Sequence, residues 1–85
     1  MYKVEFTPQA LEDISRTDKA VADRIIKKID WLSQNYEVLT PEPLKGKFEG
    51  LYKLVAGDWR ILYTFGSNNK IITIHLIRHR RDVYK

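Results

Sequence analysis

Cysteine is absent from this 85-residue chain, and histidine occurs only twice, at His75 and His79. Without cysteine the chain has no disulfides, no thiolate metal ligands, no iron–sulfur cluster and no cysteine nucleophile. Two histidines are too few for a dedicated zinc site. We therefore expect a protein that uses no metal and no cofactor.

Long apolar runs are also missing. No stretch approaches the roughly 20 residues that a membrane helix needs, and the first six residues lack the apolar segment of a secretory signal. We therefore expect a cytoplasmic protein with no membrane partner. The composition, 44% hydrophobic and 31% charged, is that of a globular chain and excludes a disordered or collagen-like one. A chain of this length predicts one domain over residues 1–85.

Acidic residues are scarce in the second half of the chain. Residues 45–85 hold nine basic and three acidic side chains, a net charge of +6, whereas residues 1–44 hold six basic and eight acidic, a net charge of −2. The basic half would attract anions, and a phosphate backbone is the commonest target of such a surface. The alternative is that the positive charge only serves solubility.

A short strand and two helices are predicted in the first half. Residues 2–6 alternate between apolar and charged side chains, as in a half-buried strand. Thr7 precedes a proline and reads as the N-cap of a first helix. Apolar residues at intervals of three and four predict a second helix over residues 19–36. Trp31 lies on the polar side of that helix, so it either packs under a returning loop or is an exposed anchor for a partner protein.

The second half predicts a three-stranded antiparallel meander. Its strands are expected over residues 51–56, 59–65 and 70–77. A two-residue turn at 57–58 places Val55 opposite Arg60, and a four-residue loop at 66–69 places Arg60 opposite His75. The predicted order is β-α-α-β-β-β, an α+β fold with two N-terminal helices packed on one face of a small antiparallel sheet.

This register gives the meander an apolar face for the helices and an open face. The third strand is expected to add Ile72, Ile74 and Leu76 to the apolar face. The open face carries Lys53, Arg60 and His75 side by side, among aliphatic residues. The basic tail, residues 78–85, begins where the third strand ends and can fold over this face. Such a cationic and partly apolar surface suits a nucleic-acid strand.

Four segments of the second half form a recognisable pattern. They are Leu44-Lys45-Gly46, Tyr52-Lys53-Leu54, Trp59-Arg60-Ile61-Leu62-Tyr63 and His79-Arg80-Arg81-Asp82-Val83-Tyr84. At this spacing and chain length they resemble the RelE/ParE superfamily of bacterial toxins, and the resemblance covers essentially the whole sequence. Its most specific parts are the hydrophobic-Arg-hydrophobic-hydrophobic-Tyr strand and the HRR(D/E)VY tail.

The resemblance favours the RelE branch, because ParE-type gyrase poisons usually lack the His/Arg/Tyr tail. It implies a RelE-like fold and a toxin of a type II toxin–antitoxin system that cleaves mRNA in the ribosomal A site. The implied partners are the ribosome, mRNA and a cognate antitoxin. Operator DNA would be reached only through that antitoxin.

The resemblance also implies residue roles. Lys53 matches the family's sheet lysine, Arg60 its mid-strand arginine and Tyr84 its C-terminal tyrosine. The last-strand arginine is Arg78 when counted back from the tyrosine without a gap, or Arg80 when the His-Arg pair is aligned. Other basic residues are expected to contact RNA more generally, and these are Lys45, Lys47, Arg81 and Lys85.

Residue chemistry is compatible with metal-free RNA cleavage. The 2′-hydroxyl of RNA can attack the adjacent phosphate if a base, an acid and cations surround the reacting groups. His79 and Tyr84 are the two candidate bases. A tyrosine, with an ordinary pKa near 10, needs cationic neighbours to lower it, whereas a free histidine already has a pKa near 6.5. Lys53 and Arg60 would stabilise the developing negative charge.

Two other functions stay open at this point. A ParE-like inhibitor of DNA gyrase would bind a protein and cut no RNA. An RNA-binding module without catalysis is the other alternative, because Val55 replaces the family's second sheet lysine. Apolar residues are expected to anchor the antitoxin, and these are Trp31, Val55, Leu62 and Ile77.

Overall fold

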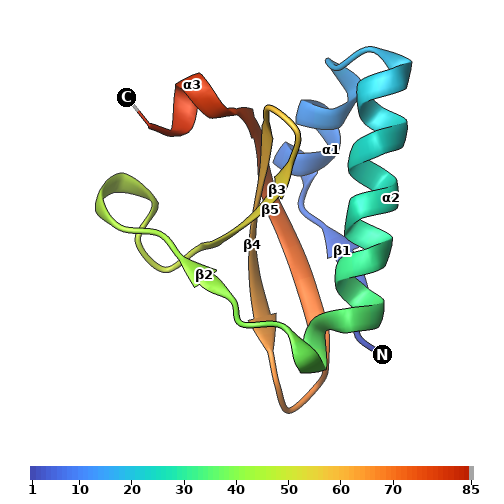
Figure 1. The fold of residues 1–85 in the computed structure, drawn as a ribbon, viewed down its shortest axis with the longest axis vertical. Helices are drawn as coiled ribbons and strands as arrows, with labels where there is room; N and C mark the ends of the chain where they lie inside the picture. The colour runs from blue at the N-terminus through green and yellow to red at the C-terminus, as the bar shows by residue number, and fades with distance from the viewer. Residues whose placement is uncertain (85) are drawn as a thin grey trace.

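A five-stranded mixed sheet forms the centre of the protein (Figure 1). The computed structural model describes residues 1–84. The strands are β1 (Lys3–Phe6), β2 (Glu42–Pro43), β3 (Tyr52–Ala56), β4 (Trp59–Gly66) and β5 (Ile71–His79). Their order across the sheet is β1-β5-β4-β3-β2, and β1 runs parallel to β5 while the other neighbours are antiparallel. The predicted antiparallel meander therefore gains a parallel strand at one edge and a two-residue strand at the other.

Two helices cover one face of this sheet, as the sequence predicts (Figure 1). They are α1 (Pro8–Ser15) and α2 (Lys19–Asn35). Thr7 Oγ1 caps the first by accepting a hydrogen bond from Ala10 N at 3.1 Å. Asp18 Oδ1 caps the second by accepting from Val21 N at 2.9 Å. In the part of the chain that the structure describes, no helix is long and apolar enough to cross a membrane.

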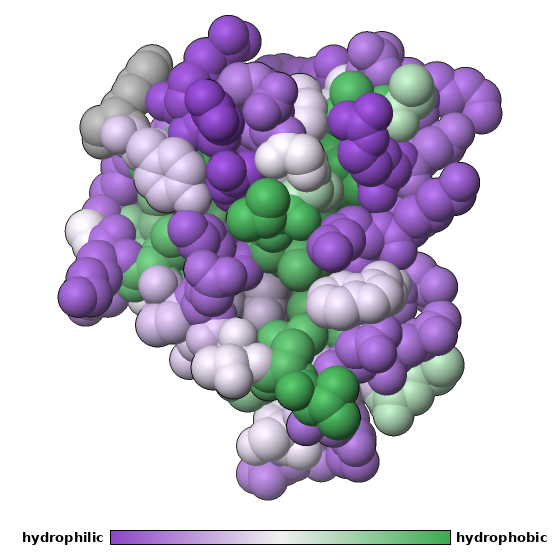
Figure 2. Space-filling view, in the orientation of Figure 1, coloured by the Kyte–Doolittle hydropathy of each residue, from purple (hydrophilic) through white to green (hydrophobic). Residues whose placement is uncertain are grey.

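Three short helical turns complete the described chain. They are η1 (Tyr36–Val38), η2 (Gly46–Phe48) and α3 (Arg80–Val83). Figure 1 shows α3 and the loop that contains η2 on the side of the sheet away from α1 and α2. In the same orientation, Figure 2 shows apolar residues as green patches down the middle, with hydrophilic side chains on both sides.

The hydrophobic core lies between the helices and the sheet. Its largest fully buried side chains are Ile25, Leu32, Ile61, Tyr63, Ile72 and Ile74. Deleting such a side chain costs about 2–5 kcal/mol, because the transfer free energy is lost and a cavity remains. This packing fixes the helices to one face of the sheet and leaves the opposite, open face for other contacts.

The first hairpin, β3–β4, has the predicted register. Val55 pairs with Arg60, and Lys53 pairs with Leu62. Gly57 in the turn has a φ of +61°, a conformation that glycine adopts without a steric penalty. Lys53 and Arg60 therefore lie on neighbouring strands and share the open face.

The second hairpin, β4–β5, departs from the prediction. The expected pairing of Phe65 with Lys70 is wrong, because the four-residue loop begins one residue later, at Ser67. Phe65 pairs with Ile72 instead. Lys70 adopts a left-handed φ of +53°, and Asn69 Oδ1 accepts a hydrogen bond at 3.2 Å from the first backbone N–H of β5. This side-chain contact stabilises the later position of the turn.

A β-bulge in β5 changes which residues face the open side. The pairing partners of Leu62 and Tyr63 are two residues apart in β5, so His75 is an extra residue between them. Beyond this bulge the side chains of β5 alternate in the opposite sense to the prediction. Arg60 lies opposite Arg78, and the predicted pairing of Arg60 with His75 is wrong.

The bulge also corrects the predicted faces. Leu76, expected in the core, lies on the open face opposite Leu62. Ile77, expected on the open face, is 2% exposed and belongs to the core. His75 does not join the cations, and its Nε2 lies 2.8 Å from Thr64 Oγ1. A one-residue insertion thus reverses the exposure of the second half of β5.

Polar groups of the α1 segment cover the edge of β5 beyond the end of β1. Thr7 donates its backbone N–H to Ile74 O at 3.0 Å and its hydroxyl to His75 O at 3.2 Å. Asp13 Oδ2 accepts a hydrogen bond from Ile77 N at 2.9 Å. These contacts replace the missing strand partner, so the backbone of β5 stays paired next to the helix.

Candidate active site

The hydroxyl oxygen of Tyr84 is the meeting point of three residues from the predicted catalytic set. Lys53 Nζ donates a hydrogen bond to it at 2.6 Å, and Arg60 Nε donates at 3.2 Å. Both cations also lie near the tyrosine ring. Lys53 Nζ is 4.9 Å from the ring centre, and the guanidinium carbon of Arg60 is 5.5 Å from it. We call these three residues, from β3, β4 and the tail, the cation–tyrosine cluster.

A short docked helix brings the tail to this position. Arg80 N donates to Asp58 O at 2.8 Å, which ties the start of α3 to the β3–β4 turn. Val83, near the end of α3, is buried. Tyr84 N then donates to Arg80 O at 3.2 Å. The expectation that the basic tail folds over the open face is therefore confirmed.

Both cations of the cluster are braced by neighbouring oxygen atoms. Arg60 Nη1 donates to Gly57 O at 2.9 Å and to Trp59 O at 3.1 Å. Lys53 Nζ also lies 3.9 Å from Glu42 Oε2 on β2. Groups held in place before a ligand arrives are the basis of electrostatic stabilisation in catalysis.

The cluster changes the acidity of its tyrosine. The hydrogen bond from Lys53, followed by the one from Arg60, lowers the pKa of the Tyr84 hydroxyl below its ordinary value of 10. The side chain is also 54% exposed, so a ligand can reach the hydroxyl from solvent. The arrangement therefore makes the phenolate, the form able to act as a base, easier to form than in free tyrosine.

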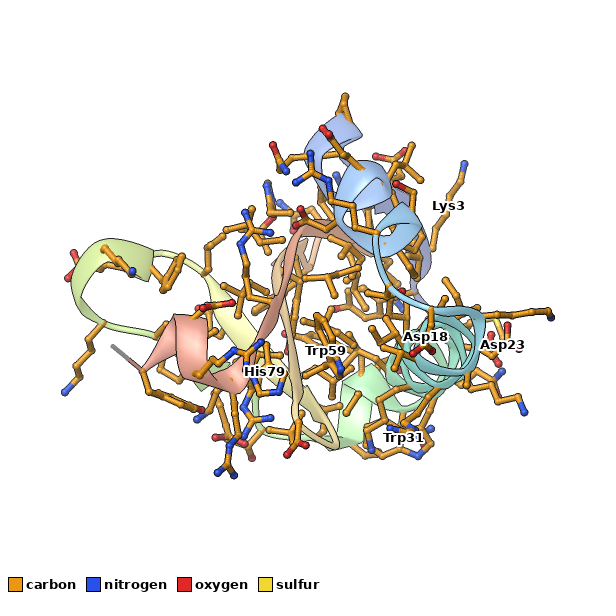
Figure 3. The ribbon with its side chains drawn as sticks, turned by 90° about the horizontal axis from the view of Figure 1, so that it is seen from above. Lys3, Asp18, Asp23, Trp31, Trp59 and His79 are labelled. Atoms are coloured by element: carbon orange, nitrogen blue, oxygen red, sulfur yellow. The ribbon has the colours of Figure 1, made fainter. Side chains whose placement is uncertain are left out.

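Arg78 and His79 lie beside the cluster and face a polar hollow of about 370 Å³. Arg78 Nη1 donates to Asp13 Oδ2 on α1. His79 Nδ1 accepts from Arg81 N at 3.3 Å, and its ring meets that of Trp59 edge-on at 5.5 Å. Figure 3 shows His79 next to α3. The structure therefore separates these two candidates from the oxygen of the tail tyrosine.

The remaining basic candidates lie on the surface. Arg80 is exposed on α3, and Arg81 is exposed next to it. Lys45 and Lys47 are exposed at the η2 loop, where Lys47 Nζ lies 5.1 Å from the ring centre of the neighbouring phenylalanine. Lys85 lies outside the described residues. Arg81, Lys45 and Lys47 remain predicted RNA contacts, and Arg80 remains a candidate for the last-strand arginine.

A second hollow, of about 230 Å³, connects α2 with the cluster, and we call it the Trp31 groove. Trp31 and Val55 line it and are 44% and 41% exposed, and Lys53 lines the same groove. Lys28 Nζ lies 4.3 Å from the Trp31 ring centre. The loop after α2, including Leu39, lines the groove without covering the indole, so Trp31 is the exposed alternative of the two that the sequence allowed (Figure 3).

Two of the expected antitoxin anchors are not surface residues. Leu62 is completely buried, and Ile77 lies in the core. Ile77 was expected on the surface because the predicted register lacks the bulge. Leu62 was expected there because the open face was assumed to be uncovered. In this structure neither side chain is available to a partner, and Trp31 and Val55 remain as the candidates.

Sequence reasoning missed Asp13. It is a charged residue on the buried side of α1, three positions after the buried Ala10. That spacing was the available signal, because positions three apart share a helix face and a carboxylate there needs a partner.

Within residues 1–84 no group of three or more metal-ligating side chains is close enough to hold an ion.

Comparison with known proteins identifies the family. Residues 4–84 match the family model of the ParE toxin of type II toxin–antitoxin systems. The chain belongs to this family. The matched region contains both long helices, the sheet and the tail up to Tyr84, and so the whole cation–tyrosine cluster. No curated protein sequence matches this ParE-family toxin.

Solved toxin structures share its fold over nearly the whole chain. A RelBE toxin–antitoxin complex from Mycobacterium tuberculosis matches with a TM-score of 0.80 and 22% identity, covering 93% of this chain and 98% of the other. The archaeal RelE–RelB complex from Pyrococcus horikoshii matches with a TM-score of 0.71 and 26% identity, covering 93% of this chain and 94% of the other. The isolated Escherichia coli RelE toxin matches with a TM-score of 0.74 and 14% identity, covering 93% of this chain and 84% of the other. The predicted superfamily and RelE-like fold are confirmed, and the chain is a toxin of a type II toxin–antitoxin system.

Proposed function

We propose that this ParE-family toxin is an endoribonuclease that cuts mRNA in the ribosomal A site. The observation that carries the proposal is the position of the Tyr84 hydroxyl, 2.6 Å from Lys53 Nζ and 3.2 Å from Arg60 Nε. A base beside two fixed cations meets the main requirements of phosphate transfer in RNA.

The nucleophile in this reaction is the 2′-hydroxyl of the RNA. The Tyr84 phenolate removes its proton, and the oxygen attacks the adjacent phosphorus. The bond to the 5′ oxygen breaks, which leaves a 2′,3′-cyclic phosphate on one product. Lys53 and Arg60 stabilise the negative charge on the phosphate oxygens. An ammonium group is a stronger acid than a guanidinium, so Lys53 supplies the proton that the departing oxygen takes up.

Tyr84 is a better candidate for the base than His79. The Nδ1 lone pair of His79 already accepts the Arg81 N–H, and the ring stands edge-on to Trp59. These contacts suit a residue that caps α3. Tyr84, in contrast, combines exposure with two cationic donors.

The open position of the cluster supports a substrate that is held by a larger assembly. Tyr84 lies on an exposed surface, and the cluster has few groups that would orient a flexible RNA by themselves. Correct alignment of a nucleophile with its phosphate can supply a large part of a rate enhancement. An mRNA threaded through the ribosome is already ordered, so the toxin needs to add only the reacting groups.

We also infer that a cognate antitoxin binds the Trp31 groove. Solved structures with this fold include complexes of toxins with their antitoxins. Trp31 and Val55 offer apolar contact, while Lys28 and Lys53 offer positive charge. The complementary ligand is an amphipathic segment with acidic side chains, disordered alone and folding on binding.

Inhibition of DNA gyrase is the second candidate, and the family description as a ParE toxin favours it. A gyrase inhibitor would act by binding a protein, and the cation–tyrosine cluster would have no catalytic role. An RNA-binding protein without catalysis is a third outcome, because Val55 stands where the resemblance places a second lysine.

Mapping of mRNA 5′ ends after induction of the toxin in growing cells separates these functions. Cuts within the codons of translated messages are expected for the wild type. Tyr84→Phe should abolish them, whereas the matched control Tyr52→Phe, on the helix side of β3, should keep them. A DNA-damage response without mRNA cuts would overturn the proposal in favour of gyrase, and neither response would leave simple RNA binding.

A further inference from the structure

Asp13 is a buried carboxylate with a complete set of partners. It is 8% exposed on the side of α1 that meets β5. Its Oδ1 accepts from Gln9 Nε2 at 2.9 Å, and its Oδ2 accepts from Ile77 N at 2.9 Å. Oδ2 also accepts a hydrogen bond from Arg78 Nη1. Burying a charge is costly unless the charge is paired, so we expect the Asp13 carboxylate to have a role that a solvated surface carboxylate would not have.

Arg78 stands between Asp13 and the cation–tyrosine cluster. Its backbone lies opposite Arg60, whose guanidinium turns toward Tyr84. The Arg78 guanidinium turns the other way, and its Nη1 also donates to Ile77 O at 3.2 Å. Among the described residues, the side-chain hydrogen bonds of Arg78 all use Nη1, and the side chain is partly exposed to the polar hollow. Its Nε and Nη2 groups are therefore available to a ligand.

We propose that Asp13 is a positioning residue, which fixes the Arg78 guanidinium at the polar hollow beside the cluster so that Arg78 binds a phosphate of the RNA. The proposal rests on the endoribonuclease function proposed above. Asp13 lines the same hollow but is only 8% exposed, and both of its oxygens already accept hydrogen bonds, so Arg78 is the group presented to the RNA. It acts through Arg78, and this selects Arg78 over Arg80 as the last-strand arginine of the site.

Two physical effects favour a carboxylate that holds Arg78: the repulsion between two arginines and the flexibility of the arginine side chain. Arg60 and Arg78 are like charges directly opposite on neighbouring strands, which is unfavourable. The Asp13 carboxylate offsets one of them where little solvent screens the interaction. An arginine side chain also has several rotatable bonds, so a fixed partner reduces the freedom that phosphate binding would otherwise remove.

Asp13→Asn is the decisive variant, because asparagine keeps an acceptor oxygen for Ile77 N and loses the charge that holds Arg78. We expect single-turnover cleavage of ribosome-bound mRNA to fall about 10- to 100-fold, the usual effect of a misplaced reacting group. The same change in an Arg78→Ala background should have no further effect, because the group that it positions is gone. Glu12→Gln removes an exposed carboxylate from its pair with Arg16 on the same helix and should leave the rate unchanged.

A structural role would give a different result. If Asp13→Asn lowers the rate equally with and without Arg78, or if Asp13→Asn cuts at the wild-type rate or faster, the proposal is wrong. Nitrogen–proton NMR of the arginine side chains gives a readout that needs no activity. We expect the hydrogen-bonded Arg78 signal to be lost in Asp13→Asn, and an unchanged signal overturns the proposal. If the wild type cuts no mRNA, the endoribonuclease function fails, and the proposed phosphate-binding role falls with it.

Discussion

Arg60 and Arg78 lie directly opposite each other on β4 and β5, yet their guanidinium groups have different partners. Arg60 donates to Tyr84, and Arg78 donates to Asp13 on α1. The divergence separates two like charges that the strand pairing brings together. It also places one guanidinium at the tail and the other at the first helix, where a carboxylate offsets its charge.

The pH dependence of cleavage should report the ionisation of Tyr84. Hydrogen bonds from Lys53 and Arg60 lower the pKa of this hydroxyl, so the phenolate forms at a lower pH than in free tyrosine. The rate should rise with pH through that lowered pKa. In Lys53→Met the remaining rate should rise at higher pH. Single-turnover rates measured against pH check this, and a rising limb at the same pH in both proteins would contradict the assignment of the base.

Arg60→Ala and Ile61→Ala should have opposite effects on activity and stability. Arg60 lies on the open face, so its removal should abolish toxicity and leave no core cavity. Ile61 is completely buried, and its truncation should lower the free energy of unfolding by about 2–5 kcal/mol. Growth assays and denaturant unfolding measure the two effects. Loss of the fold in Arg60→Ala with a stable Ile61→Ala would show that the faces of β4 are assigned the wrong way round.

Trp31→Ala should weaken antitoxin binding and leave RNA cleavage nearly intact. A partly exposed indole in a groove is the kind of residue that contributes about 2 kcal/mol or more, or roughly 30-fold in affinity. Val38→Ala is the control, since Val38 is 85% exposed and does not line the groove. Titration with the antitoxin and a cleavage assay on the same samples test this. Equal affinity of wild type and Trp31→Ala would remove this residue from the interface.

Deletion of His75 should prevent folding, whereas His75→Ala should be tolerated. Without the extra residue of the bulge, Ile77 would turn to the open face and Arg78 to the core. The alanine variant keeps the bulge and loses only the contact with Thr64, which is worth about 1 kcal/mol. Circular dichroism with thermal unfolding distinguishes the two variants. A folded deletion variant with native stability would show that the bulge does not fix the faces of β5.

The parts of the fold that local chemistry determines were predictable from the sequence. Thr7 and Asp18 are capping residues in front of amphipathic segments, and both helices begin where they predict. Gly57 suits a two-residue turn, and the first hairpin has the expected register. Because that register places Lys53 and Arg60 on one face, two members of the cation–tyrosine cluster could be placed together in advance.

The parts that depend on long-range contacts were not predictable in this way. Ser67 to Lys70 form a loop whose start is one residue later than expected, and the Asn69 contact that stabilises this position forms only when Ile71 has joined the sheet. The bulge at His75 depends on backbone contacts with the α1 segment, far away in the sequence. The role of Asp13 arises only when α1 packs beside β5.

Lys53 belongs both to the Trp31 groove and to the cation–tyrosine cluster, and this double membership limits how the toxin can evolve. A toxin that is held in check by a partner gains from mutations that evade it. If the partner binds Lys53, loss of this lysine weakens both the binding of the inhibitor and the proposed RNA cleavage. A mutation of Lys53 that avoids the antitoxin would therefore also disable the toxin. Selection can weaken the toxin–antitoxin complex only through residues farther along the groove, such as Trp31.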